Sequence, residues 1–207
     1  TKVVYWVGFG EDEDRAEAIY VTPIAAATPI NLTMDIASGL NLEGIEISAD
    51  NLWLFYVLGN DATNEHVLYR VNLSGAIAPV AVSPTTLDCV DLQFKAMPTG
   101  HGVMYARSRT GLTGTDLVYV DPTWVTDVLV TVNGTIVDGA ITPDGTRAIF
   151  IEDEYSLGED DLVSVLIADG TRTVLNEPLV TGGNVVDFVI SEDGGEVVYR
   201  ADQDVND

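Results

Sequence analysis

One short phrase recurs along the chain and constrains its fold more than any other feature. At Ile141–Arg147 an apolar-alternating segment ends in the turn Thr-Pro-Asp-Gly, and a second alternating segment follows. Proline presets the backbone at the first turn position, and aspartate and glycine tolerate the tight or left-handed conformation after it. The phrase returns at 186–199 and, more loosely, at 45–56 and 90–105. Alternation on both sides of the turn predicts pairs of half-buried strands.

The spacing of landmark residues indicates that the phrase is a structural repeat. Aromatic residues of the second strand follow one another at intervals of 45 to 51 residues: Tyr5, Tyr56, Tyr105, Phe150 and Tyr199. Two further sets keep a similar period, in the third strand (Tyr20, Tyr69, Tyr119, Ser164) and at the end of the first (Ser48, Lys95, Thr142, Ser191). Such a period with several strands per unit is typical of a propeller blade. We therefore predict an all-β fold, a β-propeller or partial propeller of four-stranded antiparallel blades.

The repeat divides the chain into five segments. We expect an incomplete blade over 1–33, complete blades over 43–83, 88–132 and 135–180, and a second incomplete blade over 184–207. A two-residue insertion is expected near Met97–Gly100, in the first turn of the third unit. Both end segments cut through a blade and would leave open sheet edges, so we expect a part of a larger propeller or closure by strand sharing, between the ends or with another copy.

Composition limits the classes of partner. The 207 residues include 33 acidic and 9 basic side chains, for a net charge of −24. Such a surface repels nucleic acid and anionic lipid, and no apolar run approaches 18 residues, so we expect neither nucleic-acid binding nor membrane insertion. The charge suits a salty or extracellular setting, where ions screen it, but also an ordinary bacterial protein surface. The single cysteine, Cys89, is expected to be a buried structural thiol.

The turn phrases resemble a known family. Ile141–Arg147 and Ile190–Gly194 are similar to the Ser-Pro-Asp-Gly signature of TolB-type, WD-like propeller repeats of bacteria, and Val198–Asp204 is similar to the second strand and acidic loop of such repeats. The resemblance covers the whole chain, although only two of the four turns keep Asp-Gly. It implies a scaffold that binds other proteins in the periplasm or outside the cell. It transfers no catalytic residue, because the motif consists of turn and core positions and propellers host many roles.

Acidic side chains gather in the loops between second and third strands and are candidate ligands for calcium. Clustered carboxylates beside glycine supply the oxygen atoms that calcium prefers, although none of these loops matches the twelve-residue calcium loop. A solvated acidic rim is the simpler explanation. The candidate ligands are Asp12, Asp14, Asp153, Asp160, Asp161, Asp202 and Asp204.

Three more carboxylates share one position in the repeat and could ring a central channel. They are Asp91, Asp138 and Asp187, with Gly44 in their place in the first complete unit. A local hydrogen bond to the backbone where the strand begins is the simpler role for each.

Arg107, Arg109 and Trp124 are the candidates for an interaction surface. The two arginines end the second strand of the third unit, where the other units carry acids. They could contact an acidic loop on another blade or subunit, or be ordinary surface scatter. Trp124 follows a proline turn and is expected to be the most exposed tryptophan, whereas Trp6 and Trp53 are expected to pack within the sheets.

No arrangement of residues points to catalysis. His66 and His101 fall in different units, and no Gly-x-Ser-x-Gly motif is present. We predict no catalytic residue and no certain cofactor, with calcium as the candidate ion. The chain is interpreted as a non-catalytic, periplasmic or extracellular scaffold for protein interaction or assembly, with self-association through open blade edges as one possibility. The alternative is the propeller part of a larger hydrolase or lyase whose catalytic residues lie outside this chain.

Overall fold

Every regular element in the described part of the chain is a β-strand, and there is no helix in it. The all-β prediction is confirmed. The described residues divide into two compact units, Thr1–Leu92 and Gln93–Asp207, and each is considered by itself. The computed structural model describes residues 2–8, 16–25, 28–33, 36–37, 39–60, 63, 65–83, 94–108, 114–132, 134–154 and 158–203.

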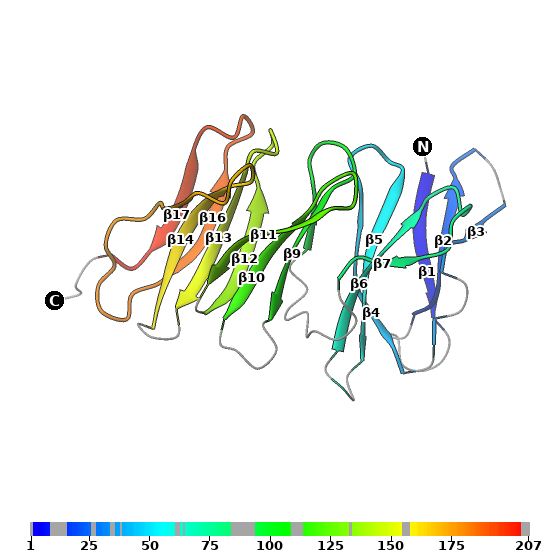
Figure 1. Cartoon of the computed structure of the whole chain (residues 1–207), viewed down its shortest axis with the longest axis horizontal. Coiled ribbons are helices and arrows are strands. Elements are labelled where there is room, and N and C mark those ends of the chain that lie inside the picture. The colour runs from blue at the N-terminus through cyan, green and yellow to red at the C-terminus, as the bar shows by residue number, and fades with distance from the viewer. Residues whose placement is uncertain are drawn as a thin grey trace. The chain divides into compact units, whose positions relative to one another are not determined.

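The first unit contains two antiparallel sheets (Figure 1). One has three strands in the order β1-β2-β3, and the other has four in the order β4-β5-β6-β7. Within each sheet, every strand pairs antiparallel with the next one along the chain. The strands are β1 (Lys2–Gly8), β2 (Ala16–Pro23), β3 (Ile30–Asn31), β4 (Asn41–Ile47), β5 (Trp53–Asn60), β6 (Glu65–Asn72) and β7 (Val80–Ala81).

The second unit contains two four-stranded sheets and one hairpin (Figure 1). The third sheet holds β8 to β11, the fourth holds β12 to β15, and β16 and β17 form the hairpin. These antiparallel four-stranded sheets are those that the repeat predicted. The strands are β8 (Phe94–Ala96), β9 (Val103–Ser108), β10 (Thr115–Val120), β11 (Thr126–Val132), β12 (Thr135–Ile141), β13 (Arg147–Glu154), β14 (Glu159–Leu166), β15 (Arg172–Val174), β16 (Val185–Ile190) and β17 (Val197–Ala201).

The second-strand aromatic is a core residue in each four-stranded sheet. Tyr56 and Tyr105 are each 2% exposed and Phe150 is 1% exposed. Phe150 packs with Met104 of the third sheet, and Tyr56 packs with Ile19 of the first. Full burial of such a side chain stabilises the fold by about 1.5–3 kcal/mol, so the repeated aromatic is placed where neighbouring sheets meet. Burial also raises the pKa of the Tyr56 phenol.

The repeated third-strand residue of the sequence lies opposite the second-strand aromatic in unit Thr1–Leu92. In unit Gln93–Asp207 it lies one position away. Tyr5 stacks on Tyr20 and Tyr56 on Tyr69, with ring centroids 5.7 and 5.5 Å apart. In the third and fourth sheets the residues opposite the aromatic are Val118 and Val163, not the predicted Tyr119 and Ser164. Because side chains alternate along a strand, a shift of one residue moves these two to the opposite face.

A hydroxyl and an aspartate close the same first turn in three sheets. The side-chain oxygens of Ser48, Thr142 and Ser191 each accept a backbone N–H from the residue five positions later, at 3.0, 3.0 and 2.9 Å. Each hydroxyl donates to the aspartate two positions later, at 2.5, 2.6 and 2.7 Å. These bonds, with others from the backbone, hold the pKa of Asp144 and Asp193 below the ordinary value of 3.8.

Met97 takes the hydroxyl position in the third sheet, so the Lys95 landmark is wrong. The backbone N–H of Met97 donates to Gly102 at 2.9 Å, as that of Thr142 donates to Arg147 at 2.9 Å. Lys95 lies within β8, opposite Met104. The turn therefore has the same length as the others, and the expected insertion is absent. The Met97 side chain is 5% exposed and packs in the core. Because no hydroxyl residue marks this turn in the sequence, its position could not be recognised there.

Turn glycines are required because each turn also approaches the preceding sheet. Gly145 and Gly194 have φ of +72° and +75°, and a Cβ atom would lie 3.4 Å from Pro98 Cγ and 3.2 Å from Pro143 Cδ, respectively. Gly170, in the β14–β15 turn, has φ of +73°, and its Cβ would lie 2.3 Å from the Leu129 backbone oxygen. The left-handed backbone disfavours a side chain at all three glycines, and the contact with Leu129 also excludes one at Gly170.

We expect Gly170→Ala to destabilise the protein more than Gly158→Ala. Both glycines are left-handed, with φ of +73° and +64°, but a Cβ at Gly158 meets nothing within 4 Å. Backbone strain costs about 1–2 kcal/mol at either position. The contact with Leu129 adds at least about 1 kcal/mol at Gly170 only. Denaturant unfolding of both variants measures the difference, and equal losses would contradict the sheet-to-sheet contact.

Candidate interaction surface

Arg107 is bonded within its own sheet. Its guanidinium nitrogens Nη2 and Nε lie 3.0 and 3.2 Å from Asp116 Oδ2 on the neighbouring strand. Thr131 of β11 donates to Asp116 Oδ1 at 2.6 Å, and the Asp116 residue is only 6% exposed. The three side chains form a polar row across β9, β10 and β11. A contact of Arg107 with another subunit stays a prediction, and Arg109 lies outside the described residues.

Trp124 is placed by a hydrogen-bonded turn between β10 and β11. Asp121 Oδ1 accepts the backbone N–H groups of Thr123 and Val125 at 2.7 and 3.0 Å and the Thr123 hydroxyl at 2.7 Å. These bonds lower the pKa of Asp121. The Trp124 ring lies 5.3 Å from that of His101, whose Nε2 is 2.9 Å from the Pro122 carbonyl oxygen. The indole is thus half-buried against a neighbouring turn.

The backbone of Trp124 is unusual. Its φ of +68° matches those of Gly75 and Gly170, at +70° and +73°, in the corresponding turns of the second and fourth sheets. A bulky side chain rarely occupies this conformation. The prediction that Trp124 is the most exposed tryptophan is wrong. Trp6 on β1 is 54% exposed, whereas Trp124 is only partly exposed. Trp53 is half-buried, with the Arg70 guanidinium 5.3 Å from its ring.

Acidic residues oppose one another at the end of the β13–β14 hairpin. Glu152 pairs with Asp161 and Asp153 with Asp160 across the two strands. Because side chains alternate along strands, the two pairs point to opposite faces of the sheet. Burial and the neighbouring Asp153 and Asp161 raise the pKa of Asp160. Among the described residues, no three acidic, histidine or cysteine side chains converge as a metal site would require.

The partners of these carboxylates are mostly side chains of their own sheet. Arg172 Nη2 lies 2.9 Å from Glu152 Oε2, and Asn176 donates to Asp161 at 2.8 Å. Asp202 follows β17, and its backbone N–H donates to Asn184 at 3.1 Å. The other predicted calcium ligands, Asp12, Asp14 and Asp204, lie outside the described residues, as does Cys89. The calcium site stays a prediction.

Two of the three carboxylates predicted to share a repeat position have local partners. Asp138 accepts the backbone N–H of Gly139 at 2.7 Å, and Asp187 accepts a hydrogen bond from Arg200 at 2.8 Å. Both residues follow a β-bulge, as Gly44 does in β4. Asp91 lies outside the described residues. The bulge therefore defines the shared position better than the carboxylate does.

A polar cleft of about 410 Å³ lies between the fourth sheet and the β16–β17 hairpin. Among the described residues that line it, Arg147 is the one charged side chain, and it donates to the Ser164 hydroxyl at 3.0 Å. No carboxylate, histidine or cysteine is among these described lining residues. Sequence reasoning missed this cleft because its lining comes from separate strands: Thr142, Arg147, Ile149, Ser164, Thr173, Leu175, Gly194, Gly195, Val197 and Tyr199.

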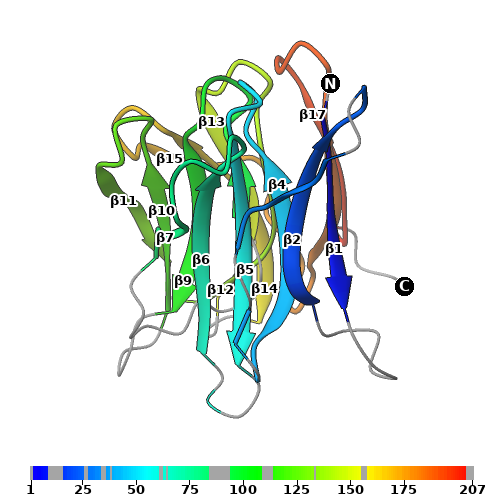
Figure 2. The same ribbon diagram turned by 90° about the vertical axis from the view of Figure 1, so that its right-hand side faces the viewer.

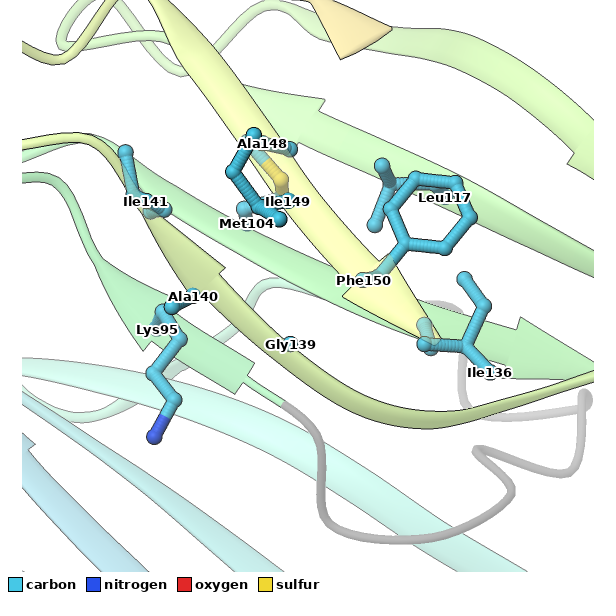
Figure 3. A pocket seen from close by; sticks show the side chains of 11 residues that line it. Lys95, Met104, Leu117, Ile136, Gly139, Ala140, Ile141, Ala148, Ile149 and Phe150 are labelled. Carbon is cyan, nitrogen blue, oxygen red and sulfur yellow. The ribbon is translucent and has the colours of Figure 1, made fainter. Parts of the chain in front are cut away.

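A smaller cavity between the third and fourth sheets is a packing void (Figure 3). Its volume is about 30 Å³, close to the space of one water molecule. Met104, Leu117 and Phe150 are among its apolar lining, and the Lys95 ammonium points away from it. It is too small for an organic ligand.

His66 has a carboxylate partner but no nucleophile beside it in the described structure. Its Nδ1 lies 2.6 Å from Glu43 Oε2, and both side chains are largely buried. Gly59 leaves room for Glu43, because a Cβ atom there would overlap the carboxylate. The pair joins β4 and β6 across β5.

Comparisons with known proteins identify the fold. No family model matches the sequence, and neither does any curated protein. Among solved structures, TolB from Acinetobacter baumannii is similar, with a TM-score of 0.61 and 15% identity, over 96% of this chain and 46% of that one. The fold is that of a TolB-like β-propeller. The sequence-based resemblance is confirmed at this level.

Other propeller-containing structures are equally similar. Dipeptidyl peptidase 4 of Porphyromonas gingivalis matches with a TM-score of 0.69 and 14% identity, over 95% of this chain and 30% of that one. An oligogalacturonate lyase, solved with manganese, matches with a TM-score of 0.57 and 10% identity, over 86% of this chain and 51% of that one. This propeller chain spans about half or less of each of these three proteins. At such identities the likeness extends to the fold alone. The described residues also include no helix that could span a membrane.

Replacing Arg107 should destabilise the propeller. Arg107→Leu removes the guanidinium that bonds to Asp116, whose side chain is 9% exposed. We expect a loss of about 2–3 kcal/mol, below the usual range for a broken buried pair because Arg107 keeps 19% exposure. Arg200→Leu is the control, since the Arg200–Asp187 pair is 70% and 60% exposed and is worth less than about 1 kcal/mol. Equal losses in denaturant unfolding would contradict a structural role for Arg107.

Proposed function

We propose that this chain is a non-catalytic propeller module that binds a cationic protein partner. The observation that carries the proposal is the opposition of like charges at the end of the β13–β14 hairpin. Asp153 and Asp160 face each other directly across the strands, and like charges in that position destabilise a sheet. The net charge of −24 adds to this repulsion. A positively charged partner would relieve both.

The position of these acids near the ends of two paired strands favours binding over a structural role. Loops and strand ends on a rigid sheet scaffold are the usual place for contacts with partners. The pKa of Asp160 is raised by burial and by Asp153 and Asp161, so its carboxylate is held where its negative charge is unfavourable. A lysine or arginine of a partner would interact most strongly with such a group, because partial burial weakens screening by water.

Binding of a lysine-rich peptide at 0.15 M salt tests the proposed function. We expect the Asp153→Asn/Asp160→Asn variant to bind at least about fivefold more weakly than the unchanged protein. Glu192→Gln/Glu196→Gln removes the same charge from two exposed residues of another turn and should retain most of the affinity. Isothermal titration calorimetry measures both. Equal weakening by both variants would indicate general charge attraction and would contradict a defined acidic surface.

We further propose that the acidic hairpin and loops bind calcium weakly. Carboxylate oxygens are the ligands calcium prefers, and the paired charges of Asp153 and Asp160 would be neutralised by a divalent ion. Millimolar calcium should raise the midpoint of thermal unfolding by a few degrees, because an ion that binds only the folded state stabilises it. Sodium chloride at matched ionic strength is the control. Equal shifts from the two salts would contradict the proposal.

A periplasmic or extracellular location fits this proposal. The likeness to TolB structures supports it, and so does the negative surface charge, which external salt would screen. A fusion of the full natural protein to a reporter that is active only outside the cytoplasm tests the location.

The second candidate function is the propeller part of a larger hydrolase or lyase. It is favoured by the similarity to dipeptidyl peptidase 4 and to oligogalacturonate lyase, which are longer than this chain. The full coding sequence separates the two functions. A hydrolase domain with a Gly-x-Ser-x-Gly motif on the same polypeptide would overturn the binding proposal, and further blades after a signal peptide would support it.

A further inference from the structure

We use outer strand for the last strand of each sheet in chain order: β3, β7, β11 and β15. The outer strand of the third sheet, β11, differs from the others. β11 has seven residues, whereas β3 and β7 have two each and β15 has three. Within the described part of the chain, β11 pairs only with β10, at the end of its sheet (Figure 2). Its other edge therefore presents main-chain N–H and C=O groups that no strand of the described residues uses.

The first three residues of β11, Thr126–Val128, lack several of the features that normally protect such an edge. Proteins blunt edge strands by making them short or by adding lysine or proline. Six of the seven residues of Thr126–Val132 are threonine, valine or leucine, and none is lysine, arginine or proline. Val128 is 48% exposed and Val125, in the preceding turn, is 54% exposed. The strand is thus rich in strand-forming residues and partly apolar at its surface.

Trp124 stands directly before this edge at a cost in backbone energy. Its φ of +68° falls where the corresponding turns have glycine, and a left-handed residue with a side chain costs about 1–2 kcal/mol. Strained residues of this kind concentrate at binding sites, where the side chain has a use. His101 and the Asp121 hydrogen bonds hold the indole in place. The ring is therefore preorganised beside the edge.

The usable part of the edge ends at Leu129. The β14–β15 turn comes against the Leu129 carbonyl, where Gly170 leaves room for it. Leu129 also lies at a β-bulge, because the register with β10 shifts between Leu117 and Val118. The remaining surface is Trp124–Val128, which we call the Trp124 edge. Its open main-chain groups lie at 126–128, because the N–H groups of Trp124 and Val125 already donate to Asp121.

We propose that the Trp124 edge binds an extended, basic segment of the partner protein, which adds to β11 as a further antiparallel strand. This inference rests on the proposed function. Only a strand can use the main-chain groups of an open edge, and the side chains along it then determine specificity. Asp121 precedes the indole by three residues in the sequence, and lysine or arginine can interact with a carboxylate and with an aromatic ring. A second copy of this chain would instead bring another charge of −24.

The test uses a peptide of alternating valine and threonine flanked by lysines. A second peptide has the same charge but carries N-methyl groups on the amides of one strand edge, which removes their hydrogen bonds. We expect the first peptide to bind at least about tenfold more tightly than the second, in calorimetry at 0.15 M salt. Amide hydrogen exchange should slow at 126–128 when the first peptide binds.

Two protein variants match each other in charge and secondary structure. Val128→Lys adds a lysine to the Trp124 edge, and Val174→Lys adds one to β15, the short outer strand of the fourth sheet, where Val174 is 42% exposed. We expect Val128→Lys to weaken peptide binding about tenfold and Val174→Lys to change it less than twofold. Denaturant unfolding identifies any variant that fails to fold, and the peptide comparison on the unchanged protein then decides.

The remaining outcomes separate this inference from the proposed function. Equal binding of both peptides would still support a cationic partner but would overturn strand addition at β11. Binding of neither peptide would overturn the inference. If the lysine-rich peptide of the previous section also failed to bind, the proposed function would be contradicted as well. A concentration-dependent dimer that Val128→Lys abolishes would replace the partner strand with a second copy and also overturn the inference.

Discussion

The packing of one aromatic side chain between neighbouring sheets is the constraint on which the rest of the structure depends. A four-stranded sheet of short strands cannot bury its own apolar face, so each must pack on the next. Tyr56 and Phe150 occupy this position and are almost completely buried. Because the position must recur in every sheet, it imposes the period of the sequence. The turn glycines follow from the same constraint, since Gly170 and Gly194 lie where one sheet approaches the one before it.

The recurring polar residues are explained mainly by turns. The hydroxyl and aspartate of Thr142–Asp144 hydrogen bond to each other and to the backbone across the turn, as do those of Ser191–Asp193. These carboxylates are therefore used in the scaffold. The acids that are not repeated, such as Asp153 and Asp160, are the ones that oppose and repel each other across two strands. A role in recognition is thus better sought in departures from the repeat than in the repeat itself.

The third sheet contains most of these departures. Met97 replaces the turn hydroxyl, Trp124 stands where other turns have glycine, and β11 is longer than any other outer strand in the described structure. Trp124 could be singled out from the sequence because a tryptophan after Pro122 is unusual in a turn. Its left-handed backbone and its neighbour His101 could not, since they depend on the contact between two turns. The length of β11 could not be predicted either, because apolar alternation does not tell a paired strand from an open edge.

The sequence by itself determined the all-β class, the blade repeat and the positions of the core aromatics, because period-two alternation and turn residues are local signals. Only the tertiary structure decided the register between strands. Register depends on which side chains meet across a sheet, so a shift of one residue moved Tyr119 and Ser164 from their predicted place. It also decided the partner of Arg107, since Asp116 becomes its neighbour only when β9 and β10 pair. Local chemistry thus specified the strands, and packing between them specified where each charge and aromatic ring lies.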